Sequence, residues 1–420
     1  MPTTRETILT ALHARLPADV YWGVHTLRAV ENFPISGQAI GLVPDLITAL
    51  AAIKQAAALT NAELGLLDPV LRDAIVAACE DIRAGRLHDQ FVVDQIQGGA
   101  GTSTNMNTNE VIANRALEVM GHAKGSYDHL HPNEHVNLSQ STNDVYPTAL
   151  RLAAWLGIHR LITAMASLRL AFADKAVEFA DILKMGRTQL QEAVPMTLGQ
   201  EFNTFAIMLG EDEARLAEAA NLILEINLGG TAIGTGITTH PDYAAKVCAA
   251  LARITGVPVI AAADLIEATQ DCGAFVQLSG VLKRVAVKLS KTCNDLRLLS
   301  SGPRAGFNEI NLPAMQAGSS IMPGKVNPVI PEVVNQVAFE VIGNDVTITF
   351  AAEAGQLQLN AFEPMIAHSL FRSIAHLEAA CRTLETGCIR GITANREILR
   401  ASVENSIVGL EQCIQADVTG

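Results

Sequence analysis

The chain has 420 residues and a net charge of −13; 49% of its residues are hydrophobic, 17% charged and only 4% aromatic. This acidic balance, without any run of basic residues, argues against binding to nucleic acid or to an anionic membrane surface. Because aromatic residues are scarce and apolar ones abundant, we expect a large core of Leu, Ile, Val and Ala and a buried subunit interface.

Apolar residues recur with helical spacing over long stretches of the chain. Within 273–299 they follow the three- and four-residue spacing of one helical face. Similar patterns predict helices at 143–177, 197–228, 331–353 and 362–390. A helix of about 30 residues is about 45 Å long, so several of them indicate an elongated bundle. No strand-rich segment is expected, and the predicted fold class is all-α.

The first polar connector, 98–107, is rich in glycine and in hydroxyl side chains. At a helix start, such a loop could hold an anion through backbone N–H groups. It lacks the Gly-Lys-Ser/Thr of a Walker loop and does not match the dinucleotide-binding fingerprint. Taken alone, the pattern is more typical of a helix-capping turn.

The second connector contains two histidines four residues apart, His131 and His135, with Glu134 between them. This composition suggests zinc at first sight. However, Pro132 disfavours the helix that a His-Glu-x-x-His site needs, and the order of residues is different. No metal site is predicted there.

Ser141, Thr142 and Asn143 form a triplet of neutral donors directly before an apolar helix. One of them is expected to cap the helix N-terminus. Three exceed the needs of capping, and neutral donors suit a carboxylate.

The third connector, Gly-Arg-Thr-Gln-Leu-Gln, carries Thr188 and Gln189. It is either a polar turn or a source of further contacts to a carboxylate or an amine.

The fourth connector, 318–328, reads Gly-Ser-Ser-Ile-Met-Pro-Gly-Lys-Val-Asn-Pro. Its prolines and glycines exclude a helix interior. It places two hydroxyls, a cation and a carboxamide close together, at Ser319, Ser320, Lys325 and Asn327. The segment is either a solvated connector or a mobile loop that closes over an anionic substrate, with Gly318 and Gly324 as hinges.

At these four loops the chain resembles the aspartase/fumarase superfamily, whose signature loop matches 318–328. The resemblance runs from about Leu16 to about Ser406. Within the superfamily, the chain is more similar to the aspartate ammonia-lyases than to the class II fumarases. It has Gly-Gly-Ala-Gly-Thr-Ser-Thr-Asn at 98–105, where fumarases have Ser-Gly-Thr-Gln-Ser-Asn, and Gln189, where they have histidine.

The resemblance implies a carbon–nitrogen lyase that reversibly converts L-aspartate to fumarate and ammonia. The reaction would remove the Cβ proton and pass through an aci-carboxylate intermediate. The resemblance also implies a homotetramer in which each site is built from three subunits. Two alternatives stay open: a class II fumarate hydratase, and a non-catalytic, truncated relative.

The resemblance also implies roles for individual residues. Ser319 would be the base that removes the Cβ proton. Gln189 stands where fumarases carry a histidine paired with a glutamate, so Glu332 has no such partner. The implied substrate contacts are Thr102, Ser141 and Thr142 to the developing aci-carboxylate, Lys325, Asn327 and Thr188 to the α-carboxylate, Asn143 and Gln189 to the ammonium, and Ser320 within the loop.

No redox or carbonyl cofactor is expected, because the substrate carboxylate itself accepts the electrons. Some family members are activated by a divalent cation such as magnesium at a separate site, for which the sequence offers no ligand set.

The seven cysteines include no Cys-x-x-Cys pair, which predicts reduced thiols in a cytoplasmic protein. No run of about 18 uncharged apolar residues predicts a membrane span.

The predicted domains are a smaller N-terminal helical lyase domain at 1–139 and a central long-helix bundle at 140–395. Residues 396–420 are predicted to be the remnant of a small C-terminal domain. Family members normally continue further into that domain, so the chain is expected to lack most of it.

Overall fold

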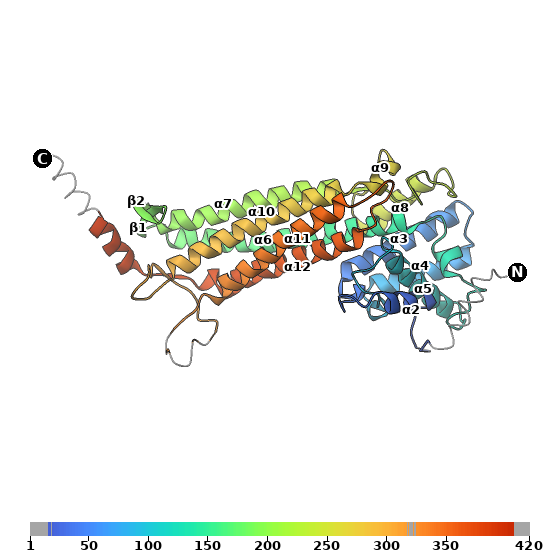
Figure 1. Ribbon diagram of the computed structural model, residues 1–420, viewed down its shortest axis with the longest axis horizontal. Coiled ribbons are helices and arrows are strands. Elements are labelled where there is room, and N and C mark those ends of the chain that lie inside the picture. Colours follow the sequence, from blue (N-terminus) through green and yellow to red (C-terminus); the bar gives the residue numbers. More distant parts are fainter. Residues whose placement is uncertain (1–15, 18, 317, 319–321, 323–324, 407–420) are drawn as a thin grey trace, which may run out of the picture. The chain divides into compact units, whose positions relative to one another are not determined.

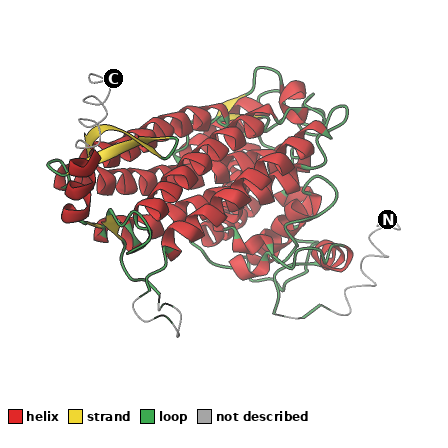
Figure 2. Cartoon of the chain, turned by 60° about the vertical axis from the view of Figure 1, so that its left-hand side comes forward, coloured by secondary structure: helices red, strands yellow, loops and turns green. Residues whose placement is uncertain are grey.

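The computed structural model describes residues 16–17, 19–316, 318, 322 and 325–406. Helices dominate, and the predicted all-α class is confirmed (Figures 1 and 2). The α-helices are α2 (Val24–Asn32), α3 (Pro44–Glu63), α4 (Pro69–Arg83), α5 (Thr102–Val119), α6 (Thr142–Glu178), α7 (Leu198–Leu222), α8 (Tyr243–Thr255), α9 (Leu265–Gln270), α10 (Gly273–Leu299), α11 (Val329–Glu353) and α12 (Glu363–Gly387). The 3₁₀ turns are η2 (Ile40–Leu42), η3 (His88–Gln90) and η5 (Ile389–Gly391), and η4 (Pro132–Val136) is a π-helical turn.

Short strands of two to seven residues also occur, none of which was predicted individually. They are β1 (Leu183–Thr188) with β2 (Gln191–Thr197), antiparallel, β3 (Glu225–Ile226) with β4 (Ile260–Ala261), parallel, and β5 (Ile310–Asn311) with β6 (Thr393–Ala394), antiparallel. They appear as yellow segments in Figure 2. Each pair satisfies backbone hydrogen bonds in a connector between helices, so they leave the helical class unchanged.

The chain divides into two compact units, each built from three segments. The first unit comprises Met1–Gly157, Ala219–Ser279 and Asp345–Arg372, and the second comprises Ile158–Glu218, Gly280–Asn344 and Ser373–Gly420. The five longest described helices, α6, α7, α10, α11 and α12, each begin in one unit and end in the other. The predicted domain boundaries after residues 139 and 395 stay predictions.

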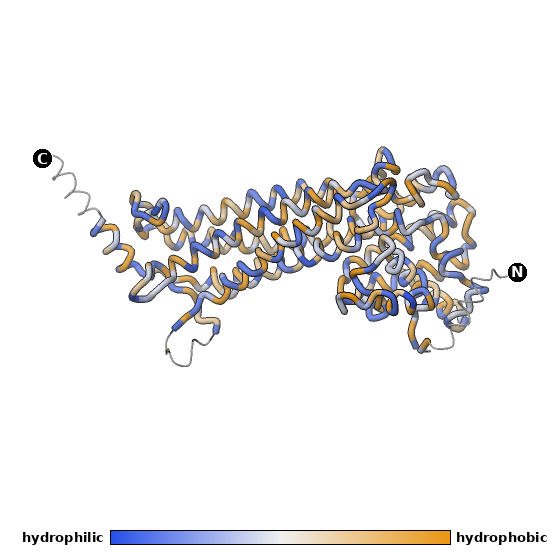
Figure 3. Tube along the Cα trace, viewed as in Figure 1, coloured by the Kyte–Doolittle hydropathy of each residue, from blue (hydrophilic) through white to orange (hydrophobic). Residues whose placement is uncertain are grey.

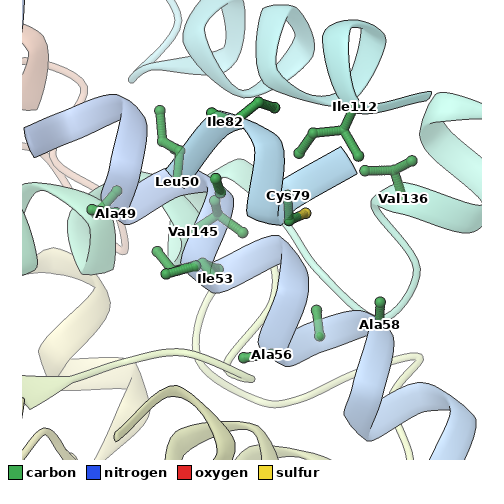
Figure 4. Packing of buried hydrophobic residues seen from close by; sticks show 14 of the residues in the cluster. Ala49, Leu50, Ile53, Ala56, Ala58, Cys79, Ile82, Ile112, Val136 and Val145 are labelled. Carbon is green, nitrogen blue, oxygen red and sulfur yellow. The ribbon is translucent and has the colours of Figure 1, made fainter. Parts of the chain in front are cut away.

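The core of the first unit is built around α3, which is buried on nearly every side. Pro44 occupies its first turn, where the missing N–H costs no hydrogen bond. Most of its buried residues are alanine, leucine and isoleucine, and the small alanines let α4 and α8 approach closely. Figure 4 shows Leu50 and Ile53 of α3 packed near Ile82 of α4 and Ile112 of α5. This packing fixes the helix α5, whose first turn carries Thr102.

The core of the second unit gathers four phenylalanines. Phe172, Phe179, Phe202 and Phe205 lie with ring centroids between 5.2 and 6.2 Å apart, in tilted or edge-to-face arrangements. Along α7 and α10, hydrophobic and hydrophilic residues occur together within the turns (Figure 3), as expected for helices buried on one side. These four rings join the end of α6 to the first turns of α7.

Among the described residues, α6 alone is long and apolar enough to cross a membrane by length and composition. In the structure, 44% of its most apolar stretch is already buried inside the protein, and core helices of soluble proteins pass the same test. The six cysteines within the described ranges are all buried with free thiols.

Candidate active site

The predicted site residues fall into two groups, one in each unit. Thr102, Ser141, Thr142 and Asn143 belong to the first unit, and Thr188, Gln189, Lys325 and Asn327 to the second. Gly318 is also described, whereas Ser319, Ser320 and Gly324 lie outside the described residues. The roles assigned to all of them by resemblance are proposals that we take up below.

The glycine-rich connector forms the start of α5 through three consecutive residues with positive φ. Gly99, Ala100 and Gly101 have φ of 88°, 56° and 90°. This turn brings the hydroxyl of Thr102, the first residue of α5, within 2.7 Å of the Gly99 carbonyl, to which it donates. Thr102 is exposed at a helix N-terminus, where the helix dipole favours an anion. The connector thus forms a turn before α5, whose N-cap Gly101 has no side-chain cap hydrogen bond, and the anion cradle stays a prediction.

Gly101 is the position in this turn that allows no side chain. A Cβ built there would come within 2.8 Å of three ring atoms of Tyr146, which is buried in α6. At Gly99, with nearly the same φ, a Cβ would meet Thr102 only at 3.7 Å, an ordinary contact. The starts of α5 and α6 are therefore packed directly against each other.

We expect Gly101→Ala to destabilise the protein by about 2–4 kcal/mol, because left-handed strain adds to overpacking against a buried ring. Gly99→Ala is the matched control, since it carries the same strain without the clash and should cost about 1–2 kcal/mol. Urea unfolding at one protein concentration measures both. Equal losses in the two variants would show that Tyr146 does not constrain the turn.

The triplet before α6 behaves partly as a cap. The hydroxyl of Ser141 accepts a hydrogen bond from the backbone N–H of Asn143 at 3.2 Å, so the predicted N-cap is confirmed and is Ser141. The side-chain amide of Asn143 donates to the carbonyl of Ala232 at 2.7 Å. This contact fixes the orientation of the amide, and Oδ1 is its atom able to accept from a ligand.

Asp144 holds the segment Ser141–Asn143 in place through buried hydrogen bonds, and the sequence analysis did not identify it. Its carboxylate is fully buried and accepts backbone hydrogen bonds from Ser141, Gly229 and Thr231, at 3.0, 3.1 and 3.0 Å. Burial raises the pKa of Asp144 to about 6, while these hydrogen bonds oppose the rise. The carboxylate thus ties the first turn of α6 to the loop at 229–231.

Lys54 of α3 is the second missed residue. Its side chain is fully buried, and the ammonium donates to the Oδ1 atoms of Asn105 and Asn137, both at 2.8 Å. Burial lowers the pKa of Lys54 to about 7, and the charge of Asp144 opposes this shift. In the sequence, Lys54 only interrupts an apolar helix, and nothing there signals a contact with the polar connectors.

In the second unit, Thr188 and Gln189 lie at the tip of the hairpin β1–β2. The turn between paired Thr188 and Gln191 has two residues, Gln189 and Leu190, with φ of 53° and 63°. Two positive φ values match the twist of the strands, as in type I′ turns. The polar turn predicted here is confirmed as a turn, and both Thr188 and Gln189 are exposed.

The base of this hairpin is held by a buried ionic cluster around Glu309. The Glu309 carboxylate lies 2.8 Å from the ammonium of Lys184 and 2.6 Å from the guanidinium of Arg187, both on β1. Lys184 also contacts Glu201 of α7 at 2.6 Å. The guanidinium of Arg187 stacks over the Phe307 ring at 4.3 Å. This cluster joins the hairpin to the segment that leads into the signature loop.

Lys325 and Asn327 line a cavity of about 810 Å³ beside that segment. Other polar residues that line it are Arg304, Asn308 and Asn311. A Cβ at Gly318 would collide with the carbonyl oxygen of Lys325, so the two ends of the signature loop approach closely there. The described part of the loop thus presents a lysine and a carboxamide to a cavity that Ile310, Leu312 and Val326 also line.

The connector with two histidines forms the π-helical turn η4, although a helix was not expected there. The Nδ1 of His131 accepts from the backbone N–H groups of Asn133 and Glu134, at 3.1 and 3.2 Å. The Nδ1 of His135 accepts from the N–H of His131 at 2.8 Å. Among the described residues, no group of three His, Cys, Asp or Glu side chains could hold a metal ion.

Comparisons with known proteins identify the family. The model of a family described as "Lyase" matches residues 13–343. Aspartate ammonia-lyases of Helicobacter pylori J99, Escherichia coli K12 and Pseudomonas aeruginosa PAO1 are 61%, 59% and 63% identical to this chain; each match covers 93% of the chain, and 83%, 82% and 83% of the respective relative.

Two solved structures share the fold. One, described as a fumarate lyase:delta crystallin from Brucella melitensis bound to cobalt, has a TM-score of 0.91 and 58% identity. The other, a class II fumarase from Schistosoma mansoni, has a TM-score of 0.89 and 35% identity. Each match covers 92% of this chain and 84% of the solved chain. The resemblance seen in the four loops is therefore confirmed, and the chain belongs to the lyase family.

Proposed function

We propose that this lyase is an aspartate ammonia-lyase, which reversibly converts L-aspartate to fumarate and ammonia. The observation that carries the proposal is the identity of 59–63% to aspartate ammonia-lyases over 93% of the chain. The class II fumarase is 35% identical, and fumarases carry a histidine where this chain has Gln189. Both the overall identity and the loop residues favour ammonia over water as the leaving group.

The reaction places its heaviest demand on the β-carboxylate of the substrate. Removing the Cβ proton gives an aci-carboxylate with two negative charges, so the site must stabilise charge that develops only in the transition state. Ser141 and Thr142 are neutral donors at the N-terminus of α6, where the helix dipole also favours an anion. Thr102 begins α5, and its hydroxyl would turn from the Gly99 carbonyl to donate to the substrate. We assign these three residues to the aci-carboxylate.

The remaining substrate contacts follow from charge and hydrogen-bonding capacity. Lys325 and Asn327 line one cavity and would hold the α-carboxylate, together with Thr188. Asn143 would accept from the ammonium through Oδ1, because its amide nitrogen already donates to the Ala232 carbonyl. Gln189 and Ser320 complete the proposed contacts.

Ser319 is the proposed base. A serine hydroxyl is a very weak base in water, so it would act as an alkoxide or close to one, stabilised by Lys325 and by backbone N–H groups where water is excluded. Gln189 cannot titrate, so the histidine–glutamate alternative of the fumarases, with Glu332, is absent from this sequence. Gly318 and Gly324 would act as hinges of the loop that carries the base.

We also propose a homotetramer, in which three subunits contribute to each site. Phe339 and Phe350 of α11 are 62% and 69% exposed, and Val346 on the same helix is 52% exposed. Large apolar side chains exposed along one helix favour burial against another copy of the chain.

We place the enzyme in the cytoplasm, where its buried thiols would stay reduced. No resident cofactor is needed for the elimination, and magnesium activation at a separate site stays a prediction.

The reverse reaction tests the proposed function. Purified protein should consume fumarate only when ammonium is present, and the product identified by proton NMR should be aspartate. Malate formation that is independent of ammonium would instead identify a fumarate hydratase. A folded protein that forms neither product would favour the non-catalytic alternative.

A further inference from the structure

Asn105 of α5 lies buried between a lysine and a proposed substrate-binding threonine. Its Oδ1 is 2.8 Å from the ammonium of Lys54, and its Nδ2 is 3.1 Å from the hydroxyl oxygen of Thr142. Asn105 and Lys54 are fully buried, and Thr142 is 8% exposed at the start of α6. The three side chains form a continuous hydrogen-bonded chain from the core of the first unit to its proposed substrate-binding donors.

The chemistry of the lysine fixes the direction of every hydrogen bond in this chain. An ammonium group has three hydrogens and no lone pair, so only the oxygen of the Asn105 amide can face it. The amide nitrogen then points to Thr142 and donates to its hydroxyl oxygen. The amide of Asn137 is oriented in the same way, with its oxygen toward Lys54. This Oδ1 accepts from Lys54, Asn105 and Asn109, at 2.8, 3.2 and 3.2 Å.

The direction of these bonds decides what Thr142 can do. A hydroxyl has one hydrogen and two lone pairs, and the Asn105 amide fills one of the lone pairs of Thr142. Within the described part of the chain, no acceptor is assigned to the Thr142 hydrogen. The Thr142 hydrogen is therefore left for a ligand, and a donor is what a carboxylate requires.

We propose that Asn105, oriented by Lys54, is a positioning residue that directs the Thr142 hydroxyl hydrogen to the carboxylate that becomes the aci-carboxylate. The inference rests on the proposed function, because it concerns the charge that develops in that reaction. The positive charge of Lys54 also polarises the amide and the hydroxyl in sequence, which strengthens the final donor. The cost of burying this charge is offset in part by Asp144.

Asn105→Asp tests the proposal with almost no change in shape. The new carboxylate would pair with Lys54, so the buried charge stays compensated. Both of its oxygens are acceptors, however, and the Thr142 hydroxyl would turn to donate to it instead of to the substrate. We expect kcat and kcat/KM for aspartate to fall together by about 100-fold, as for loss of one donor to a transition-state anion, with KM changed by less than about threefold.

Asn109→Asp is the matched control. Asn109 lies one helical turn further along α5, is equally buried and donates to the same Asn137 oxygen, yet makes no hydrogen bond with Thr142. If the loss in Asn105→Asp came merely from an added carboxylate in this core, Asn109→Asp should lose as much activity. We expect Asn109→Asp to keep kcat within about threefold of the wild type.

A double-mutant cycle with Thr142→Val decides whether Asn105 acts through the hydroxyl. Valine keeps the shape of threonine and removes the donor, so Asn105→Asp should then cost less than about threefold further. Full additivity of the two losses, with the wild type active on aspartate, would overturn the inference and leave the proposed function standing. A wild type inactive on aspartate would instead overturn the proposed function.

If Asn105→Asp fails to fold, Lys54→Met provides the same test. Methionine removes the charge without leaving an unpaired ion in the core. The Asn105 amide is then free to turn, and kcat should fall by about tenfold or more, again with little further effect in the Thr142→Val background. An unchanged kcat in Lys54→Met, or an additive loss, would contradict the proposed chain.

Discussion

Replacing Ser319 by alanine should lower kcat for aspartate deamination by about 10³-fold or more, while substrate affinity stays nearly unchanged. The reason is that general base catalysis contributes about 10²–10⁴-fold, and Gln189 offers no titratable substitute. Because the hydroxyl acts on the Cβ proton rather than on a charged group of the substrate, its removal should leave ground-state binding intact.

The measurement combines turnover with binding. Turnover is followed as ultraviolet absorbance of fumarate, and affinity is measured by calorimetry with a competitive dicarboxylate. Ser320→Ala is the comparison: it removes a proposed substrate contact in the same loop rather than the base, so it should weaken affinity and cost far less in kcat. A Ser319→Ala variant with near-normal turnover would refute the assignment of the base.

Replacing Glu309 by alanine should destabilise the protein by about 3–5 kcal/mol, the typical cost of removing one partner from a buried ionic cluster. The side chains of Lys184 and Glu309 are only 3% and 2% exposed. Lys184 would keep Glu201, but Arg187 would lose its carboxylate partner and retain the Phe307 ring. Because Arg187 directly precedes Thr188, the KM for aspartate should rise as well.

Urea unfolding at one fixed protein concentration measures the loss, since assembly would otherwise shift the apparent stability. Glu201→Ala is the control, because Glu201 is 22% exposed and contacts only one of the two cations. It should cost about 1 kcal/mol or less. If both variants lost the same stability, Glu309 would not be the centre of the cluster.

Helical periodicity predicted the long elements closely. The segments predicted at 273–299 and 143–177 correspond to α10 (Gly273–Leu299) and α6 (Thr142–Glu178). The helix predicted at 197–228 ends earlier, at Leu222, because Glu225 and Ile226 pair with β4. Such pairing depends on a segment more than thirty residues away, which no local pattern reveals.

The hairpin β1–β2 shows why strands were missed. Its sequence has few β-branched residues, and it includes Gly186 and Pro195. The turn residues Gln189 and Leu190 both adopt positive φ, which in sequence is normally signalled by asparagine or glycine. Tertiary contacts around Glu309 hold this hairpin where local propensity does not favour it.

The sequence predicted only those residues of the candidate site that lie in the polar connectors, and not the buried residues that support them. Hydroxyl and amide triplets such as Ser141–Asn143 stand out because they lie in connectors between apolar helices. Lys54, Asn105 and Asp144 support them from within helices, and their partners are distant in sequence. A buried lysine inside an apolar stretch is a signal that could have been noticed, but its partners are visible only in the fold.

The most direct measurement is the ultraviolet absorbance of fumarate formed by the purified protein from L-aspartate, beside an equal concentration of L-malate. We predict fumarate from aspartate, with one ammonia released for each fumarate, and little or none from malate. Fumarate formed from malate, with none from aspartate, would contradict the assignment as an aspartate ammonia-lyase.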